Sequence, residues 1–126
     1  MATFAQPLAA PQTSQHTLGE STCVVSAGPW FSAVTSTAFA DTAREAYLGG
    51  ARDIVLDLTA VRAVDAAGTA TLAMVADELD DMGCELAVAS MHPGLVSWLE
   101  ATPLEARLPV HDTVAGALAD LLRRPV

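Results

Sequence analysis

The sequence predicts an α/β fold built on a mainly parallel β-sheet. Short apolar runs alternate with segments whose apolar residues recur at helical spacing, which is typical of parallel βαβ units. Glycine, proline or helix-capping residues separate these segments. The chain has 126 residues, the length of one domain with a substantial core.

The periodicity of the apolar residues places each element along the chain. In order, we expect a short strand near His16–Leu18, a strand at Thr22–Ala27, a helix from Val34 to Leu48, a strand at Ile54–Leu58, a helix from Ala66 to Met82, a strand at Cys84–Ser90, a short helix from Pro93, a strand at Arg107–Val110 and a last helix at Val114–Arg123. Residues 1–20 are expected to form a flexible or irregular lead-in, and the domain to span residues 21–126.

Local residue types justify the elements of the first half. β-Branched residues favour the strand at 22–27, and Gly28-Pro29 ends it. Gly49-Gly50 ends the first helix. The apolar run at 54–58 is typical of a strand that is covered on both faces. Asp65 then stands where the N-cap of the next helix belongs.

The second half follows the same logic. Leu86-Ala-Val-Ala predicts a buried strand, and Pro93 suits the first position of a helix. His111-Asp112-Thr113 supplies capping groups for the last helix, whose apolar stripe is the most regular in the chain. Arg123 and Arg124 suit the negative end of that helix dipole.

Charge excludes several functions. The net charge is −9, and the six basic residues are all arginines. A nucleic-acid binder needs a basic face to neutralise phosphates, so nucleic acid is not expected as a partner. The absence of lysine excludes a P-loop, a Schiff base and the lysine of receiver domains. The acidic balance favours solubility and basic partner surfaces.

The sequence shows no membrane or secretion signal. No apolar run approaches the roughly 20 residues that cross a bilayer. The N-terminus lacks the basic residues and long apolar stretch of a signal peptide. We therefore expect a cytoplasmic location and no insertion into a membrane.

No catalytic or metal-binding pattern is visible. Cys23 and Cys84 are far apart, which favours free, buried thiols over a disulfide in a cytosolic chain. The cysteines and His16, His92 and His111 show no metal-ligand spacing. No G-x-S-x-G elbow exists. We expect no metal, no cofactor and no enzymatic activity.

Three stretches together carry a family resemblance. In the first, Val55-Leu-Asp-Leu-Thr is followed after five residues by Asp65-Ala-Ala-Gly68. The second is the helix, glycine and strand succession at 79–88, and the third is the run 96–118. In order and spacing they resemble a STAS domain (sulfate transporter and anti-sigma factor antagonist), over about residues 22–123.

The resemblance implies a small mixed, mainly parallel sheet with about four helices, mostly on one side. It also implies a protein that docks onto a partner without catalysis. In anti-sigma factor antagonists, an Asp-Ser-Ser/Thr-Gly loop lies at the partner surface. A kinase phosphorylates one of its hydroxyls, and a phosphatase removes the phosphate.

Here the two hydroxyl positions hold Ala66 and Ala67, which cannot be phosphorylated. Thr69 and Thr71 are the nearest hydroxyls and the only weak candidates for modification. The expected partner-binding loop is Asp65, Ala66, Ala67, Gly68 and Thr69.

Several residues allow two interpretations. Asp65 is a helix cap or a partner contact, and Ala66-Ala67-Gly68 is a small-residue helix start or a close-approach docking surface. Asp57 is a strand-end carboxylate bonded to loop amides, rather than a phosphoacceptor of receiver type. Asp77–Asp81 is a solvated helix face or a landing site for a basic partner. Trp30-Phe31 is a core or loop anchor, or an exposed pair at an interface.

The resemblance leads to two functional hypotheses. The first is a cytoplasmic, bacterial regulatory module that resembles an anti-sigma factor antagonist and acts in signalling and regulation of transcription. It would bind an anti-sigma factor or kinase-like protein. The alternative is a STAS-type accessory subunit of a transporter, such as a phospholipid ABC system, that supports an ATPase. An enzyme or nucleotide sensor is disfavoured, and a homodimer remains open.

Overall fold

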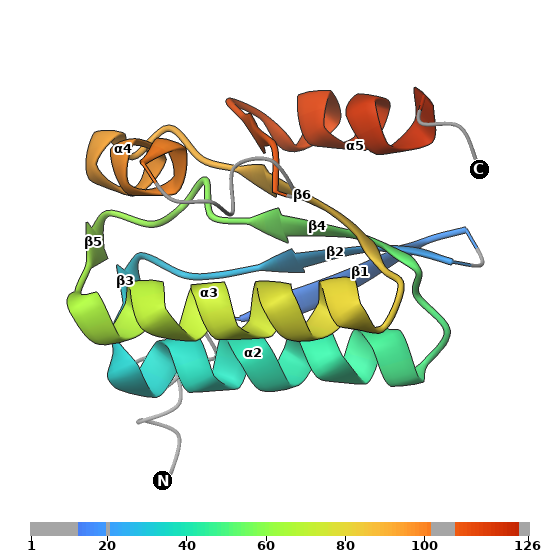
Figure 1. The fold of residues 1–126 in the computed structure, drawn as a ribbon, viewed down its shortest axis with the longest axis horizontal. Helices are drawn as coiled ribbons and strands as arrows, with labels where there is room; N and C mark the ends of the chain where they lie inside the picture. Colours follow the sequence, from blue (N-terminus) through green and yellow to red (C-terminus); the bar gives the residue numbers. More distant parts are fainter. Residues whose placement is uncertain (1–12, 20, 102–107, 124–126) are drawn as a thin grey trace, which may run out of the picture.

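The computed structural model describes residues 13–19, 21–101 and 108–123, which hold two sheets and four helices (Figure 1). The strands are β1 (Ser14–Leu18), β2 (Thr22–Ser26), β3 (Trp30–Phe31), β4 (Asp53–Asp57), β5 (Ala63–Val64), β6 (Glu85–Ala89) and β7 (Val110–His111). The helices are α2 (Ala33–Leu48), α3 (Ala66–Asp81), α4 (Pro93–Glu100) and α5 (Val114–Arg123).

The main sheet is mixed and mainly parallel, as predicted. Its five strands have the order β1-β2-β4-β6-β7. β1 runs antiparallel to β2, and every other neighbouring pair is parallel. The strand expected near His16–Leu18 is therefore present as the edge strand β1, and the sheet begins before residue 21. The rest of the expected lead-in, residues 1–12 and 20, lies outside the described residues.

The helices cover the two faces of this sheet unequally. Figure 1 shows α2 and α3 side by side on one face and α5 on the other. Because successive strand residues point to opposite faces, neighbours on one strand enter different cores. Leu56 belongs to the large core with α2 and α3, whereas Val55 packs with Ala117 and Leu121 of α5. Leu95 and Leu99 of α4 also join the large core, so the helices lie mostly on one side, as the resemblance implies.

A second, two-stranded sheet was not predicted. β3 and β5 pair in parallel, with Trp30 opposite Ala63 and Phe31 opposite Val64. These strands follow the carboxyl ends of β2 and β4 in the chain. We call this pair the β3–β5 ribbon. Each of its strands has two residues, which is too short for a periodic pattern to reveal.

The other boundaries differ from the prediction by a few residues. β4 begins at Asp53 and ends at Asp57, one residue earlier at each end than expected. The expected strand at Arg107–Val110 is β7, which covers Val110–His111, and Arg107 lies outside the described residues, as do Arg124 and the chain end. Within the described ranges, no helix combines the length and the apolar character needed to cross a bilayer.

Candidate protein-docking surface

The first turn of α3 is fixed by its N-cap, Asp65. The Gly68 amide donates to the Asp65 carboxylate at 2.8 Å, and the Thr69 amide donates to the Asp65 carbonyl at 3.1 Å. A carboxylate at this end also interacts favourably with the helix dipole. The predicted N-cap is confirmed. Asp65, Ala66 and Ala67 are exposed, whereas Gly68 is buried.

Gly68 is buried because it lies directly against the β3–β5 ribbon. A Cβ added at Gly68 would lie 2.3 Å from the carbonyl oxygen of Phe31, closer than any side chain can approach. That oxygen also accepts a hydrogen bond from the Asp65 amide at 3.2 Å. Phe31 is itself buried and meets Phe39 edge to face, with ring centroids 5.3 Å apart. The start of α3 is thus held against a rigid support.

The exposed turn offers small side chains and no free hydroxyl. Ala66 and Ala67 present methyl groups to solvent. The Thr69 hydroxyl donates to the Ala66 carbonyl at 2.9 Å, and the Thr71 hydroxyl donates to the Ala67 carbonyl at 3.0 Å. The first amides of a helix have no carbonyl partner within the helix, so a partner can approach this turn closely and bond to its backbone.

Exposed apolar side chains lie near this turn. Trp30 precedes Phe31 in β3 and has 59% of its surface exposed. The pair therefore divides between the two interpretations given above: Phe31 is a core anchor, and Trp30 is an exposed aromatic residue. Val34 is exposed in the first turn of α2, and Met74 is exposed on α3, seven residues after Ala67 and so on the same face.

The loop that leads from β4 to the ribbon is tied down by Asp57. Its carboxylate accepts from the Thr59 amide at 3.0 Å, from the Thr59 hydroxyl at 2.6 Å and from the Ser26 hydroxyl at 2.8 Å. Asp57 is thus a strand-end carboxylate bonded to the following loop, as expected. Its oxygens connect the end of β2 to the first residues of the β4–β5 loop.

A groove that the sequence does not reveal lies beside the ribbon. It has a volume of about 450 Å³, opens to solvent, and is lined by Pro29, Trp30, Thr59, Ala60 and Arg62. Residues about 30 positions apart meet here because the Arg62 and Ala63 amides both donate to the Pro29 carbonyl, at 2.8 and 3.1 Å. We call it the Trp30–Arg62 groove.

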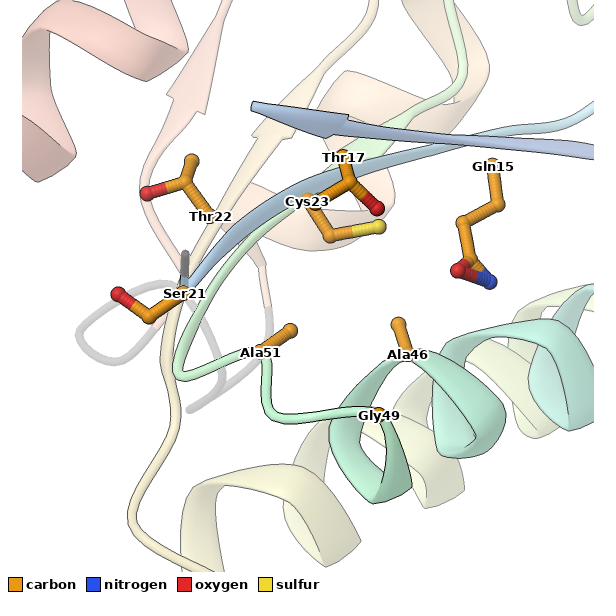
Figure 2. Close-up of a pocket in the computed structure, with 8 residues that line it drawn as sticks. All are labelled: Gln15, Thr17, Ser21, Thr22, Cys23, Ala46, Gly49 and Ala51. Atoms are coloured by element: carbon orange, nitrogen blue, oxygen red, sulfur yellow. The ribbon is translucent and has the colours of Figure 1, made fainter. Parts of the chain in front are cut away.

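A second pocket lies at the opposite end of the main sheet. Figure 2 shows Gln15 and Thr17 of β1, Cys23 of β2 and Ala46 of α2 around a space of about 70 Å³, into which the Cys23 sulfur points. Burial raises the pKa of the Cys23 thiol, so it stays protonated and a poor nucleophile. Both cysteines are free and buried, as expected. This pocket has the size of a packing gap and lacks reactive chemistry.

The acidic face of α3 contributes to packing between helices. Arg44 of α2 contacts Glu78 through two parallel hydrogen bonds, Nε to Oε2 at 2.8 Å and Nη2 to Oε1 at 2.9 Å. Arg44 also pairs with Asp41 at 3.0 Å. The hydrogen bonds from Arg44 lower the pKa of the Glu78 carboxyl. Part of the run Asp77–Asp81 therefore joins two helices and is not only a solvated face. We call the Arg44–Glu78 pair the clamp between α2 and α3.

Other titratable groups do not assemble a reactive centre. In the described part of the chain, no three His, Cys, Asp or Glu side chains are grouped so that they could hold a metal ion. His92 caps α4, since its Nδ1 accepts the Leu95 amide at 3.2 Å. His111 lies in β7, and its Nε2 is 3.5 Å from the Asp120 carboxylate. The candidate docking surface consists of the exposed turn at Asp65–Ala67, its exposed apolar neighbours and the Trp30–Arg62 groove.

Comparison with known families agrees with this architecture. The family model of the STAS domain matches residues 13–117. The chain belongs to the STAS domain family. No match was found among curated protein sequences.

Several solved structures share the fold at low sequence identity. An anti-sigma factor antagonist from Mycobacterium paratuberculosis is 22% identical with a TM-score of 0.74, and the alignment covers 87% of this chain and 92% of that one. The Bacillus cell fate determinant SpoIIAA, in its phosphorylated form, is 12% identical with a TM-score of 0.70 over 86% and 98% of the chains. The murine anion transporter Slc26a9 is 16% identical with a TM-score of 0.66, over 86% of this STAS chain and 19% of the transporter.

Proposed function

We propose that this STAS protein is a regulatory protein-binding module of the anti-sigma factor antagonist type, and that its switch loop lacks a phosphoacceptor. One observation carries the proposal. The loop Asp65–Thr69 is a capped helix start that packs on Phe31 through the buried Gly68, and its two expected hydroxyl positions hold the exposed Ala66 and Ala67. The likeness to anti-sigma factor antagonists supports it.

The physical properties of the turn suit docking. Its backbone is fixed by hydrogen bonds and by the packing of Gly68 against Phe31. Little conformational entropy is therefore lost on binding. Its alanine side chains permit close approach, and the exposed Trp30, Val34 and Met74 add apolar area around it. The partner we propose is an anti-sigma factor or kinase-like protein of the bacterial cytoplasm, bound without catalysis and with an effect on transcription.

The missing hydroxyls imply constitutive binding. SpoIIAA has been solved in phosphorylated and unphosphorylated forms. A phosphate group adds about −1.5 to −2 charges, which disrupts an interface near acidic groups. Ala66 and Ala67 cannot acquire that charge. The complex of this protein is therefore not released by phosphorylation at these two positions.

The substitution Ala67→Glu tests the proposed surface. A carboxylate in the first turn of a helix interacts favourably with the dipole, so the fold should be retained. In calorimetric titration with a purified anti-sigma factor kinase from the same genome, we expect the Kd to rise at least tenfold. The matched control is Ala119→Glu, an exposed alanine of α5, which should leave the Kd unchanged. Equal binding of both variants would reject the loop as the contact surface.

A kinase reaction tests the missing switch. With the same kinase and ATP, mass spectrometry should find no phosphate between Asp65 and Thr71 of the wild-type protein. The hydroxyls of Thr69 and Thr71 are already bonded to helix carbonyls. Stoichiometric phosphorylation of either threonine would contradict the proposal.

A second candidate function rests on the transporter neighbour. A part of the anion transporter Slc26a9, 19% of that chain, shares this fold. The alternative is therefore a STAS-type accessory subunit of a transporter such as a phospholipid ABC system. Co-purification with an ABC ATPase, and not with an anti-sigma factor, would favour this alternative.

A further inference from the structure

The Trp30–Arg62 groove is continuous with the proposed docking loop. Ala63 and Val64 form β5, and the next residue is Asp65, the N-cap of α3. In the same ribbon, the Phe31 carbonyl packs closely against Gly68, and the neighbouring Trp30 lines the groove. Two residues, Ala63 and Val64, therefore separate Arg62 of the groove from Asp65, the first residue of the proposed docking loop.

Trp30 is held outward by a fixed backbone. Its carbonyl accepts a hydrogen bond from the Thr35 hydroxyl at 2.5 Å, and its strand pairs with Ala63. The alternation along β3 buries Phe31 and turns Trp30 to solvent. An aromatic side chain on a rigid support loses little freedom on binding, which is why tryptophan is frequent at binding hot spots.

Arg62 differs from Arg44 and Arg52, the other two arginines of residues 21–101. Arg44 is paired with Glu78 and Asp41, and the Arg52 guanidinium donates to two carbonyls and lies 4.2 Å from the centre of the Tyr47 ring. By contrast, the exposed Arg62 guanidinium forms no hydrogen bond or ion pair with the described residues. It is therefore a cation without a partner among the described residues, in a protein of net charge −9.

We propose that the Trp30–Arg62 groove binds an acidic segment of the protein that docks on the Asp65–Thr69 loop, an inference that rests on the function proposed above. An aspartate or glutamate of that segment pairs with the Arg62 guanidinium in the planar, two-bonded arrangement that arginine favours. An apolar or aromatic residue beside it covers the Trp30 indole. The remaining acidic surface of the chain repels acidic segments elsewhere, so Arg62 fixes their position.

A selection from random 12-residue peptides displayed on phage tests this chemistry directly. Peptides would be selected on the wild-type protein and counter-selected on the Arg62→Gln variant. We expect enrichment of Asp or Glu next to Phe, Leu or Trp. Enrichment without acidic residues, or no enrichment over the counter-selection, would overturn the proposal.

Nuclear magnetic resonance then locates the bound peptide. The chain has two tryptophans, so the Trp30 indole N–H should shift on titration, while that of the half-buried Trp98 serves as an internal control. We expect Arg62→Gln to weaken peptide binding at least fivefold and Arg62→Lys to restore part of it. Arg123→Gln, an exposed arginine of α5, should have no effect. Equal shifts in wild type and Arg62→Gln would also overturn the proposal.

The same variants separate this inference from the proposed function. If Ala67→Glu abolishes binding of the anti-sigma factor kinase but Arg62→Gln and Trp30→Ala do not weaken it, the docking loop stands and the groove proposal fails. If the groove variants weaken binding and Ala67→Glu does not, the groove binds the partner and the loop assignment fails. Competition by acetate or inorganic phosphate at millimolar concentration, equal to that by the peptide, would show a small-anion site instead.

Discussion

The two ends of the main sheet contain similar short loops but present different surfaces. At the carboxyl ends of β2 and β4, buried Phe31 and Gly68 fix the exposed Trp30 and Ala67 in place. At the amino ends, the Cys23 sulfur points into a gap of about 70 Å³ between β1, β2 and α2. The exposed side chains at the first end lie on a backbone held by buried neighbours, and this combination suits the docking role proposed for it.

The largest expected effect on stability appears when one glycine at each end of the sheet is replaced by alanine and the two variants are compared. Gly68→Ala places a Cβ 2.3 Å from the Phe31 carbonyl oxygen, so the ribbon and α3 must separate. We expect a loss of about 2–3 kcal/mol in the free energy of unfolding. Gly49→Ala beside the amino-end pocket meets its nearest atom at 3.4 Å and should change stability by less than about 0.5 kcal/mol. Urea unfolding of both variants measures the difference, and similar losses would show that the close approach at Gly68 is not maintained.

A smaller effect is expected from removing a helix cap. Asp65 caps α3 through the Gly68 amide, and Thr113 caps α5 through the Gly116 amide at 3.0 Å. Asp65→Ala and Thr113→Ala should each lower stability by about 1 kcal/mol. Only Asp65→Ala should also weaken binding of the anti-sigma factor kinase, because α5 lies on the opposite face of the main sheet from α3. An equal effect of both variants on the Kd would mean that Asp65 acts through stability alone.

The smallest effect concerns the clamp between α2 and α3. Glu78→Gln should lower stability by less than about 1 kcal/mol, since both partners are partly exposed. The pKa of Glu78 lies below its ordinary value of 4.5, so the stabilisation is present above that pH and is lost as pH falls through the lowered pKa. The difference between wild type and Glu78→Gln in thermal unfolding should therefore vanish in acid, and it should shrink in 1 M salt. A difference that persists at pH 2 would exclude the ion pair as its cause.

Much of the fold could be predicted because its elements have long, regular patterns. The periodicity of 66–82 and the carboxylate of Asp65 predict both the helix α3 and its cap, and both are present. The apolar run around Val55 predicts a doubly covered strand, and this strand lies between two helical layers. These features depend on neighbours in sequence, which a single chain reveals.

The Trp30–Arg62 groove and the close packing of Gly68 against Phe31 could not be predicted in the same way. Trp30 and Arg62 meet because two strands of two residues each pair across about 30 positions, and no local pattern encodes that pairing. Gly68 looks like one of several small residues at a helix start, whereas its role depends on the distant Phe31 carbonyl. The docking role of Asp65–Thr69 stays a prediction that the binding experiments test.

The close packing of Gly68 against Phe31 has a consequence for how the protein would select its partner. Because one ribbon joins the helix start to the groove without a flexible hinge, the two contact points keep a constant separation. A partner whose complementary groups match that separation engages both points while losing its rotational and translational freedom only once, as in chelation. A related partner with a different spacing reaches one point at a time and dissociates sooner. In the proposed complex, the protein would thus discriminate between similar partners by the distance between their two contacting groups.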